Sequence, residues 1–111
     1  MTDEVILYFE DDPLSREVMK VCLTRGMGYH NVWIFEDSAD FENRLNSAGM
    51  KPDIIFLDIH MEPIDGFAML KLVRQSETYQ STKVIALTAS VMNEEVTILR
   101  EAGFDGVIAK P

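Results

Sequence analysis

Polar residues that can take part in phosphoryl transfer follow four short hydrophobic runs in this chain. VILYF leads into Glu10 and Asp11, IIFL into Asp58, VIAL into Thr88, and GVIA into Lys110. In open α/β sheets, ligands bind in the crevice beyond the carboxyl ends of the parallel strands. If the four runs are such strands, three acids, a hydroxyl and an ammonium group converge on one small site.

The acidic pair Glu10-Asp11 points to a divalent cation. Neighbouring carboxylates repel each other and raise each other's pKa unless a cation lies among them. Hard oxygen ligands in a site open to water favour Mg²⁺, which keeps several waters and uses few carboxylates. The alternative for the pair alone is a solvated acidic turn. Asp12 is better explained as the N-cap of a helix that begins at Pro13.

Asp58 is the candidate nucleophile, because it follows a wholly apolar run and should emerge at the rim of the core. A carboxylate there can attack phosphorus and become an acyl phosphate. Transfer then depends mainly on positioning and charge neutralisation, to which Thr88 and Lys110 would contribute. We expect His60 to offer the metal its backbone carbonyl while its imidazole faces solvent. Taken singly, these residues are ordinary turn, strand-end and surface positions, so only their combination favours a site.

The elements that must position these residues alternate along the chain. Apolar runs predict strands at residues 5–9, 32–35, 54–57, 84–87 and 106–109. Helical spacing predicts four helices between them, with Asp12 and Asn93 as the N-caps of the first and last. The predicted buried stripes are Leu14, Val18, Val21 and Cys22 in the first helix, Phe41, Leu45 and Ala48 in the second, Phe67, Leu70 and Val73 in the third, and Val96, Leu99 and Ala102 in the fourth. This alternation predicts βαβ units and a parallel sheet.

Size and composition limit the possibilities further. A chain of 111 residues with 47% hydrophobic and 26% charged residues is expected to fold as one domain, residues 1–111. The formal charge of −9 disfavours nonspecific binding to nucleic acid or to an anionic membrane. No apolar run is long enough to cross a bilayer, and we expect a cytoplasmic protein. The single cysteine, Cys22, cannot form an internal disulfide and is expected to be a small buried hydrophobe.

Four motifs, in this order and at this spacing, resemble the response-regulator receiver domains of two-component signalling over nearly the whole chain. These are YFEDDP, LDIHMEPIDG, ALTAS and GFDGVIAKP. The resemblance implies that Glu10 and Asp11 bind Mg²⁺, that Asp58 is the phosphoacceptor, and that His60 contributes a carbonyl ligand. It also implies that Thr88 supplies the hydroxyl that the family carries in this motif, and that Lys110 contacts the phosphoryl group. The implied fold is a doubly wound, five-stranded parallel α/β sheet with strand order 2-1-3-4-5.

The chain departs from the family pattern at three places. Glu62 stands where proline is common, with Pro63 one position later, and this adds a negative charge beside Asp58. Val107 stands where an aromatic residue commonly takes part in the activation switch. The family's fifth helix follows the Lys-Pro pair, and the sequence has no residues for it after Pro111. We therefore expect a receiver domain truncated after strand five, with an uncovered sheet face that favours self-association.

The leading hypothesis is a phosphorylation switch rather than an enzyme. A histidine kinase or histidine phosphotransfer protein would donate a phosphoryl group to Asp58 with Mg²⁺, and output would pass to a downstream protein effector. The second hypothesis is a pseudo-receiver that binds proteins without being phosphorylated. The third is an aspartate-based phosphatase or a flavin carrier. The phosphatase would need an aspartate where His60 stands, and Glu10-Asp11-Asp12 would repel the phosphate of a flavin.

Overall fold

The computed structural model describes residues 2–49 and 51–110 of the chain. Strands and helices alternate through the described ranges, as the apolar pattern predicts. The elements are β1 (Thr2–Phe9), α1 (Pro13–Val21), a π-helical turn η1 (Cys22–Gly26), β2 (Tyr29–Phe35), α2 (Phe41–Arg44), β3 (Ile54–Asp58), α3 (Gly66–Gln75), β4 (Lys83–Thr88), α4 (Asn93–Ala102) and β5 (Gly106–Ala109). None of the helices in these ranges is long and apolar enough to cross a membrane.

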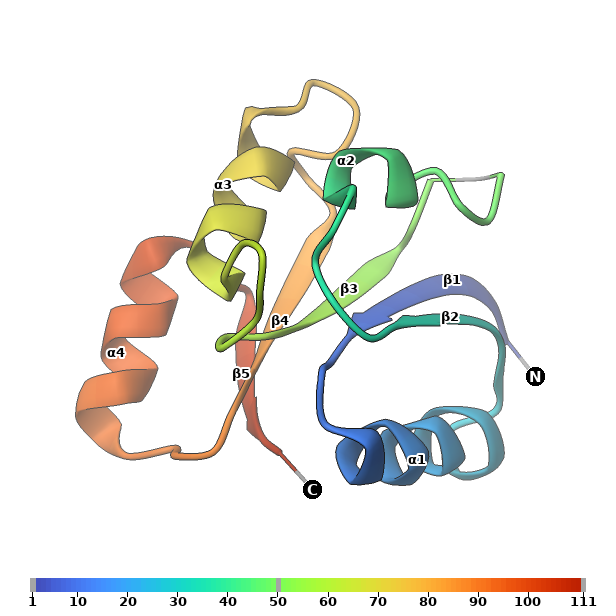
Figure 1. The fold of residues 1–111 in the computed structure, drawn as a ribbon, viewed down its shortest axis with the longest axis horizontal. Coiled ribbons are helices and arrows are strands. Elements are labelled where there is room, and N and C mark those ends of the chain that lie inside the picture. The colour runs from blue at the N-terminus through green and yellow to red at the C-terminus, as the bar shows by residue number, and fades with distance from the viewer. Residues whose placement is uncertain (1, 50, 111) are drawn as a thin grey trace.

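The five strands form one sheet with the order β2-β1-β3-β4-β5, and every neighbouring pair is parallel. Figure 1 shows this sheet with the carboxyl ends of its strands at a common edge. The predicted fold class and strand order are therefore confirmed. The chain reverses its direction of winding between β1 and β3, and a sheet of this kind binds ligands at such a point.

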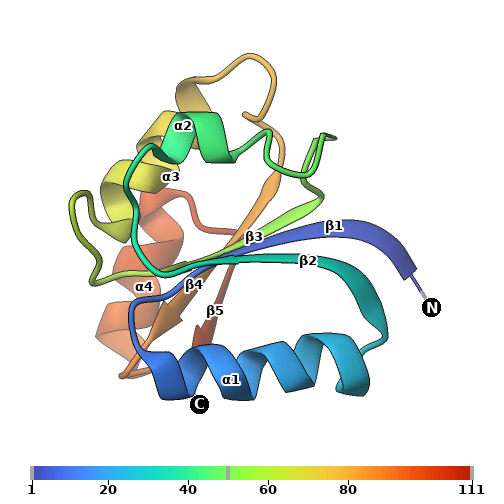
Figure 2. The same ribbon diagram turned by 45° about the vertical axis from the view of Figure 1, so that its right-hand side comes forward.

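Helices cover the two faces of the sheet unequally. Figure 2 shows α1 alone on one face, whereas α2, α3 and α4 lie on the other. Alternate residues of β1 pack into two separate cores, since side chains along a strand point to opposite faces of the sheet. Leu7 and Phe9 pack into the larger cluster with the three helices, and Ile6 and Tyr8 pack into the smaller cluster with α1.

The predicted buried stripe of α1 is wrong. Leu14, Val18 and Val21 are 71%, 38% and 50% exposed, and Cys22 is exposed as well. The helix instead turns Ser15, Met19 and the following Leu23 toward the sheet. The sequence offers two apolar stripes on this helix, and spacing alone does not tell which one meets the core.

Two further expectations about helices need correction. The second helix ends at Arg44, and 46–49 continue as turns that bond three residues back, because the Asn and Ser residues there compete for backbone hydrogen bonds. Met92, not Asn93, is the N-cap of α4, and no side chain bonds the first amides of that helix.

The predicted buried stripes of α4 and α3 are only partly correct. On α4, Leu99 is buried, Val96 is half-buried and Ala102 is exposed. On α3, Phe67 remains 38% exposed.

At the amino-terminal edge of the sheet, two aspartates accept hydrogen bonds from backbone amides of neighbouring strands. Asp53 accepts from the Val5 amide at 2.8 Å, and Asp105 accepts from the Val84 amide at the same distance. Arg74 then joins α3 to this edge, because its guanidinium donates to Asp105, to the carbonyls of Thr82 and Gly103, and to that of Gln80. These bonds fasten the amino-terminal edge of the sheet through residues that lie outside the predicted site.

The corrected orientation of α1 predicts different costs for two leucines. Leu23→Ala removes a side chain that is 1% exposed and should lower the free energy of unfolding by about 2–5 kcal/mol. Leu14→Ala removes one that is 71% exposed and should change it by less than about 0.5 kcal/mol. Urea denaturation of both variants measures the difference. Equal losses would mean that α1 packs through the stripe expected from the sequence.

Candidate functional site

The ends of four strands deliver the predicted site residues to one edge of the sheet. Glu10 and Asp11 directly follow β1, Asp58 and Thr88 are the last residues of β3 and β4, and Lys110 follows β5. Backbone register explains the meeting. Asp58 pairs with Leu87 and Thr88 pairs with Ala109, so each successive strand reaches about one residue farther toward the site.

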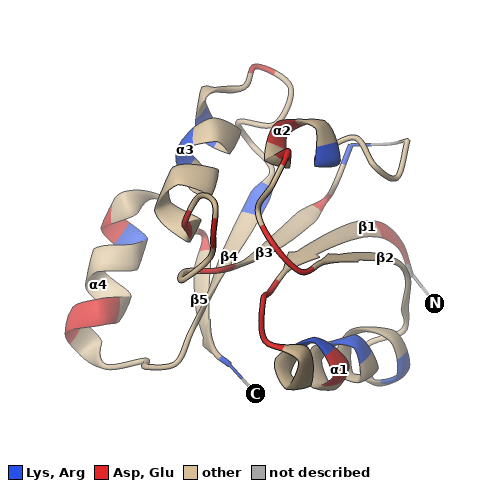
Figure 3. Ribbon diagram, viewed as in Figure 1, with Lys and Arg blue, Asp and Glu red and all other residues tan. Residues whose placement is uncertain are grey.

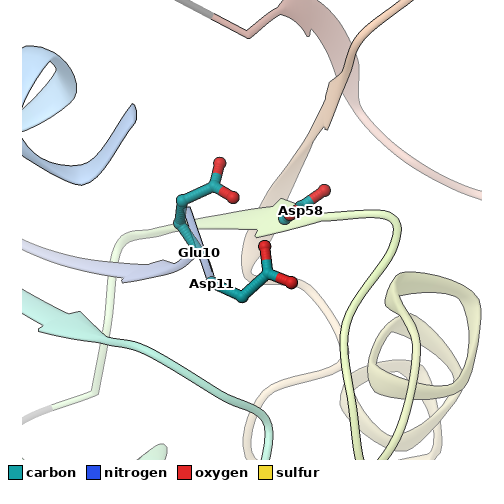
Figure 4. A group of neighbouring side chains, drawn as sticks. All are labelled: Glu10, Asp11 and Asp58. Atoms are coloured by element: carbon teal, nitrogen blue, oxygen red, sulfur yellow. The ribbon is translucent and has the colours of Figure 1, made fainter. Parts of the chain in front are cut away.

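Three carboxylates point toward a common space at this edge, as Figure 4 shows. Oxygen atoms of Glu10, Asp11 and Asp58 lie within 4.8 Å of one another. Glu10 and Asp58 are 0% and 1% exposed, whereas Asp11 is open to solvent. Buried carboxylates need charge partners or donors. The arrangement thus has two buried carboxylates and a third at the mouth of the site.

Lys110 is the charge partner of both buried acids. Its Nζ lies 3.0 Å from Glu10 Oε2 and 3.2 Å from Asp58 Oδ2. One ammonium group therefore faces two carboxylates, with the third from Asp11 nearby. The cluster keeps an excess of negative charge that a cation can neutralise.

The charges in this cluster shift the pKa values of its members in different directions. Burial, and the hydrogen bond that Glu10 shares with Asp58, raise the pKa of Glu10 to about 7. Burial also opposes ionisation of Asp58, but hydrogen bonds with Glu10 and Lys110 outweigh it and lower the pKa of Asp58. Burial likewise opposes the charge of Lys110, and its bonds to the two carboxylates raise its pKa overall. Asp58 is thereby the acid kept ionised, as a nucleophile must be.

Thr88 and His60 border the cluster. Thr88 Oγ1 accepts from the Ser90 amide at 3.2 Å and lines a hollow of about 230 Å³ between α3 and α4, together with His60. The His60 amide donates to Asp58 Oδ1 at 3.2 Å, and its side chain is exposed. This exposure agrees with the expectation that the His60 imidazole faces solvent.

Two further residues contact the cluster and did not emerge from the sequence. Arg16 Nη1 donates to the Glu10 carbonyl at 2.9 Å, and the Tyr8 hydroxyl lies 3.3 Å from Glu10 Oε1. Strand periodicity carried a signal for Tyr8, since residues two apart face the same side. Arg16 lies in the first turn of α1, whose N-cap Asp12 accepts from the Ser15 amide as predicted.

The loops around the cluster are strongly acidic. Figure 3 shows acidic segments after β1, after β2 and around the end of β3. They line a hollow of about 520 Å³ whose charged members are Asp11, Glu36, Asp37, Glu62 and Asp65. Buried Ser38 joins two of these loops, since its hydroxyl donates to the Ile64 carbonyl and accepts from the Ile64 amide. Glu62, the departure from the family pattern, therefore adds charge at the mouth.

Gly66 brings the start of α3 against the strand that ends in Asp58. Its amide donates to the Ile59 carbonyl at 2.9 Å. A Cβ atom at this position would lie 2.8 Å from Ile59 Cα and 3.1 Å from the Asp58 carbonyl oxygen. Real contacts of this kind are longer, so the backbone beside Asp58 requires glycine here.

Comparison with known proteins assigns this fold and site to a family. The model of the response regulator receiver domain matches residues 6–111. The chain belongs to this family. Receiver domains are phosphoacceptor switches of two-component systems rather than typical enzymes.

Individual relatives share this domain within different proteins. The chain is 30% identical over 113 residues to the osmosensing histidine protein kinase SLN1 of Saccharomyces cerevisiae, covering 99% of this chain and 9% of that protein. It is 29% identical to the probable C4-dicarboxylate response regulator DctR of Halalkalibacterium halodurans, covering 96% of this chain and 44% of that protein. The chain thus spans less than half the length of these curated relatives.

A solved relative of this chain holds a magnesium ion. It is the receiver domain of the sensor histidine kinase PA1611 from Pseudomonas aeruginosa, whose structure has magnesium coordinated in its active-site cleft. The two share 25% identity and a TM-score of 0.80, covering 99% of this chain and 87% of that one. In the present chain, the hard oxygen donors of Glu10, Asp11 and Asp58 fit the same class of cation.

The pKa of Glu10 predicts how the stability of the metal-free protein changes with pH. The folded protein holds this proton more tightly than the unfolded chain, so the free energy of unfolding should fall by about 1–3 kcal/mol as pH rises from 4.5 to about 7. The contribution of Asp58, whose pKa is lowered, is present throughout this window and is lost only as pH falls through its lowered value. That of Lys110 is also constant, because its raised pKa lies above the window.

Chemical denaturation across this pH range without divalent ions measures the slope. Glu10→Gln is the matched control, because it keeps the side-chain shape and removes the proton; it should flatten the dependence. An equal slope in both proteins would show that other groups cause it.

Proposed function

We propose that this chain is a two-component receiver domain that accepts a phosphoryl group on Asp58 with Mg²⁺. The observation that carries the proposal is the convergence of the Glu10 and Asp11 carboxylates and Lys110 around Asp58, a buried aspartate whose pKa is lowered. Glu10, Asp11, Asp58 and the backbone carbonyl of His60 are the proposed metal ligands. Thr88 and Lys110 are the proposed contacts of the phosphoryl oxygens.

In the proposed reaction, an Asp58 carboxylate oxygen attacks the phosphorus of a phosphohistidine. A P–O bond forms while the P–N bond breaks, and the imidazole of the donor leaves with the electron pair of that bond. When bound, Mg²⁺ supplies positive charge to the transferring phosphoryl oxygens. Lys110 already lies 3.2 Å from Asp58 Oδ2 and would add a second positive charge beside the transferring group. The Thr88 hydroxyl oxygen accepts from the Ser90 amide, and its own hydrogen can donate to the phosphoryl group at the same time.

The proposed donor is a sensor histidine kinase or a histidine phosphotransfer protein, and the proposed output is a contact with a protein effector. Relatives that contain this domain are histidine kinases and response regulators. The acidic rim around Asp11 and Glu62 suits a donor with a basic surface beside its phosphohistidine. The charge brought by the phosphoryl group would then bias the conformation of the loops that follow β3 and β4.

Mass spectrometry tests the phosphoryl transfer. Wild-type protein incubated with Mg²⁺ and a small phosphodonor such as acetyl phosphate should gain one acid-labile phosphoryl group. Asp58→Asn keeps the shape of the side chain and should gain none. Lys110→Ala should keep the metal ligands and accumulate the group at least about tenfold more slowly, because it removes one charge that stabilises the transition state.

The same measurement separates the two leading hypotheses. Val107 is half-buried against the cluster formed with α2, α3 and α4, in the place of the family's switch aromatic. If wild-type protein binds Mg²⁺ and its mass does not change, the chain is a phosphorylation-independent binding module.

We further propose that the chain self-associates through the face that carries α1. Val18 and Val21 are exposed on this helix, and Ile108 of β5 is 39% exposed. Exposed apolar groups of this size commonly mark contact surfaces.

Sedimentation velocity across a wide range of concentration tests the self-association. Wild-type protein should sediment faster as concentration rises, and Val18→Lys should restore a monomer. Ile98→Lys is the matched control, since Ile98 is 57% exposed on α4, on the other face. A monomer at every concentration, or an equal effect of both variants, would contradict the proposed surface.

A further inference from the structure

Tyr8 is a buried polar residue below the acidic cluster, for which the mechanism above has no use. Its side chain is 0% exposed and packs edge-on against Phe56, with ring centroids 6.5 Å apart. It lies on the α1 side of the sheet, in the same cluster as Met19 and Leu23. A phenylalanine would fill this space as well, and the hydroxyl therefore needs an explanation of its own.

The hydroxyl of Tyr8 faces Glu10. It lies 3.3 Å from Glu10 Oε1 and 3.4 Å from the carbonyl oxygen of Ser15 in the first turn of α1. A phenol carries one hydrogen and donates it to one acceptor or shares it between two.

The two oxygens of Glu10 have different surroundings. Oε1 faces Tyr8, whereas Oε2 accepts from the Asp12 amide at 3.2 Å and pairs with Lys110 at 3.0 Å. Oε1, the inner oxygen, thus contacts the Tyr8 hydroxyl, and Oε2, the outer oxygen, faces the cluster. A carboxylate that is fixed at one oxygen cannot rotate freely, and this sets the direction in which the other oxygen points.

We propose that Tyr8 is a positioning residue for the metal site, whose hydroxyl holds the inner oxygen of Glu10 so that the outer oxygen faces Asp58 and the cation. The inference rests on the proposed function, because it assumes that Glu10 is a ligand of Mg²⁺. Tyr8 itself touches neither the metal nor the phosphoryl group. Its contribution acts through the orientation of one carboxylate.

Calorimetric titration of Mg²⁺ into the unphosphorylated protein tests this role without reference to phosphorylation. Tyr8→Phe keeps the ring and removes the hydroxyl, and it should weaken Mg²⁺ binding about tenfold, as the loss of contacts to metal ligands commonly does. Tyr79→Phe is the matched control. Tyr79 is also buried, and its hydroxyl bonds Asn46, beyond the other end of the sheet. It should leave the affinity unchanged.

A double-mutant cycle then separates positioning from general stability. Glu10→Asp shortens the side chain by one methylene and withdraws the carboxylate from Tyr8, so adding Tyr8→Phe to it should cause no further loss of affinity. Wild-type affinity in Tyr8→Phe, or the same loss in both backgrounds, overturns the positioning role. Mg²⁺ binding to the wild type is measured before any variant. If the wild type binds no Mg²⁺, that result contradicts the proposed function itself.

A measurement on the wild type covers the case in which Tyr8→Phe does not fold. The protein has three tyrosines, and carbon-13 at the ring carbon that bears oxygen gives one resonance for each. Tyr29→Phe and Tyr79→Phe each remove one resonance and thereby identify that of Tyr8. Adding Mg²⁺ should shift the Tyr8 resonance because its acceptor gains a cation. A resonance that stays in place at saturating Mg²⁺ overturns the proposal.

Discussion

Two buried carboxylates share one ammonium group at the edge of this sheet, and the remaining features of the site follow from that imbalance. Glu10 and Asp58 both lie against Lys110, although burial makes each negative charge costly. The parallel sheet is what makes the meeting possible. Lys110 follows β5, and two strands lie between β5 and the strand that precedes Glu10. β1, β3 and β5 must therefore run in the same direction for the three charges to share a site.

The two acids beside this one ammonium group also have opposite pKa shifts. Glu10 is the one whose pKa rises, and Asp58 stays ionised beside Lys110. Asp11, at the open mouth, adds a third negative charge. Lys110 pairs with both buried acids, but one ammonium group leaves the three carboxylates with a net negative charge. The proposed Mg²⁺ would reduce that charge, and a phosphoryl group on Asp58 would change it again.

The sequence predicted the parts of this structure that depend on repetition. The five strands, their parallel direction and the convergence of Glu10, Asp11, Asp58 and Lys110 follow from apolar runs that end in polar residues, although β1 and β2 begin three residues earlier than predicted. The strand order came from the resemblance to receiver domains. The orientation of α1 did not follow, because Leu14 and Val18 form one apolar stripe while Met19 and Leu23 form another, and spacing gives both the same weight. The contact between Tyr8 and Glu10 did not follow either, because strand periodicity places both residues on one face but does not show that the hydroxyl reaches the carboxylate.

Gly66 shows how a residue without functional groups can limit the variation of such a site. It offers neither charge nor hydrogen-bonding side chain, yet a single extra carbon there would press on the backbone of Asp58 and Ile59. Among random variants of this chain, tolerance at position 66 should resemble that of a reactive residue more than that of an ordinary helix start. A position can therefore be intolerant to substitution because two backbones pack closely as well as because its side chain reacts. Gly66 is the contact through which a shift of the backbone at Asp58 would reach α3.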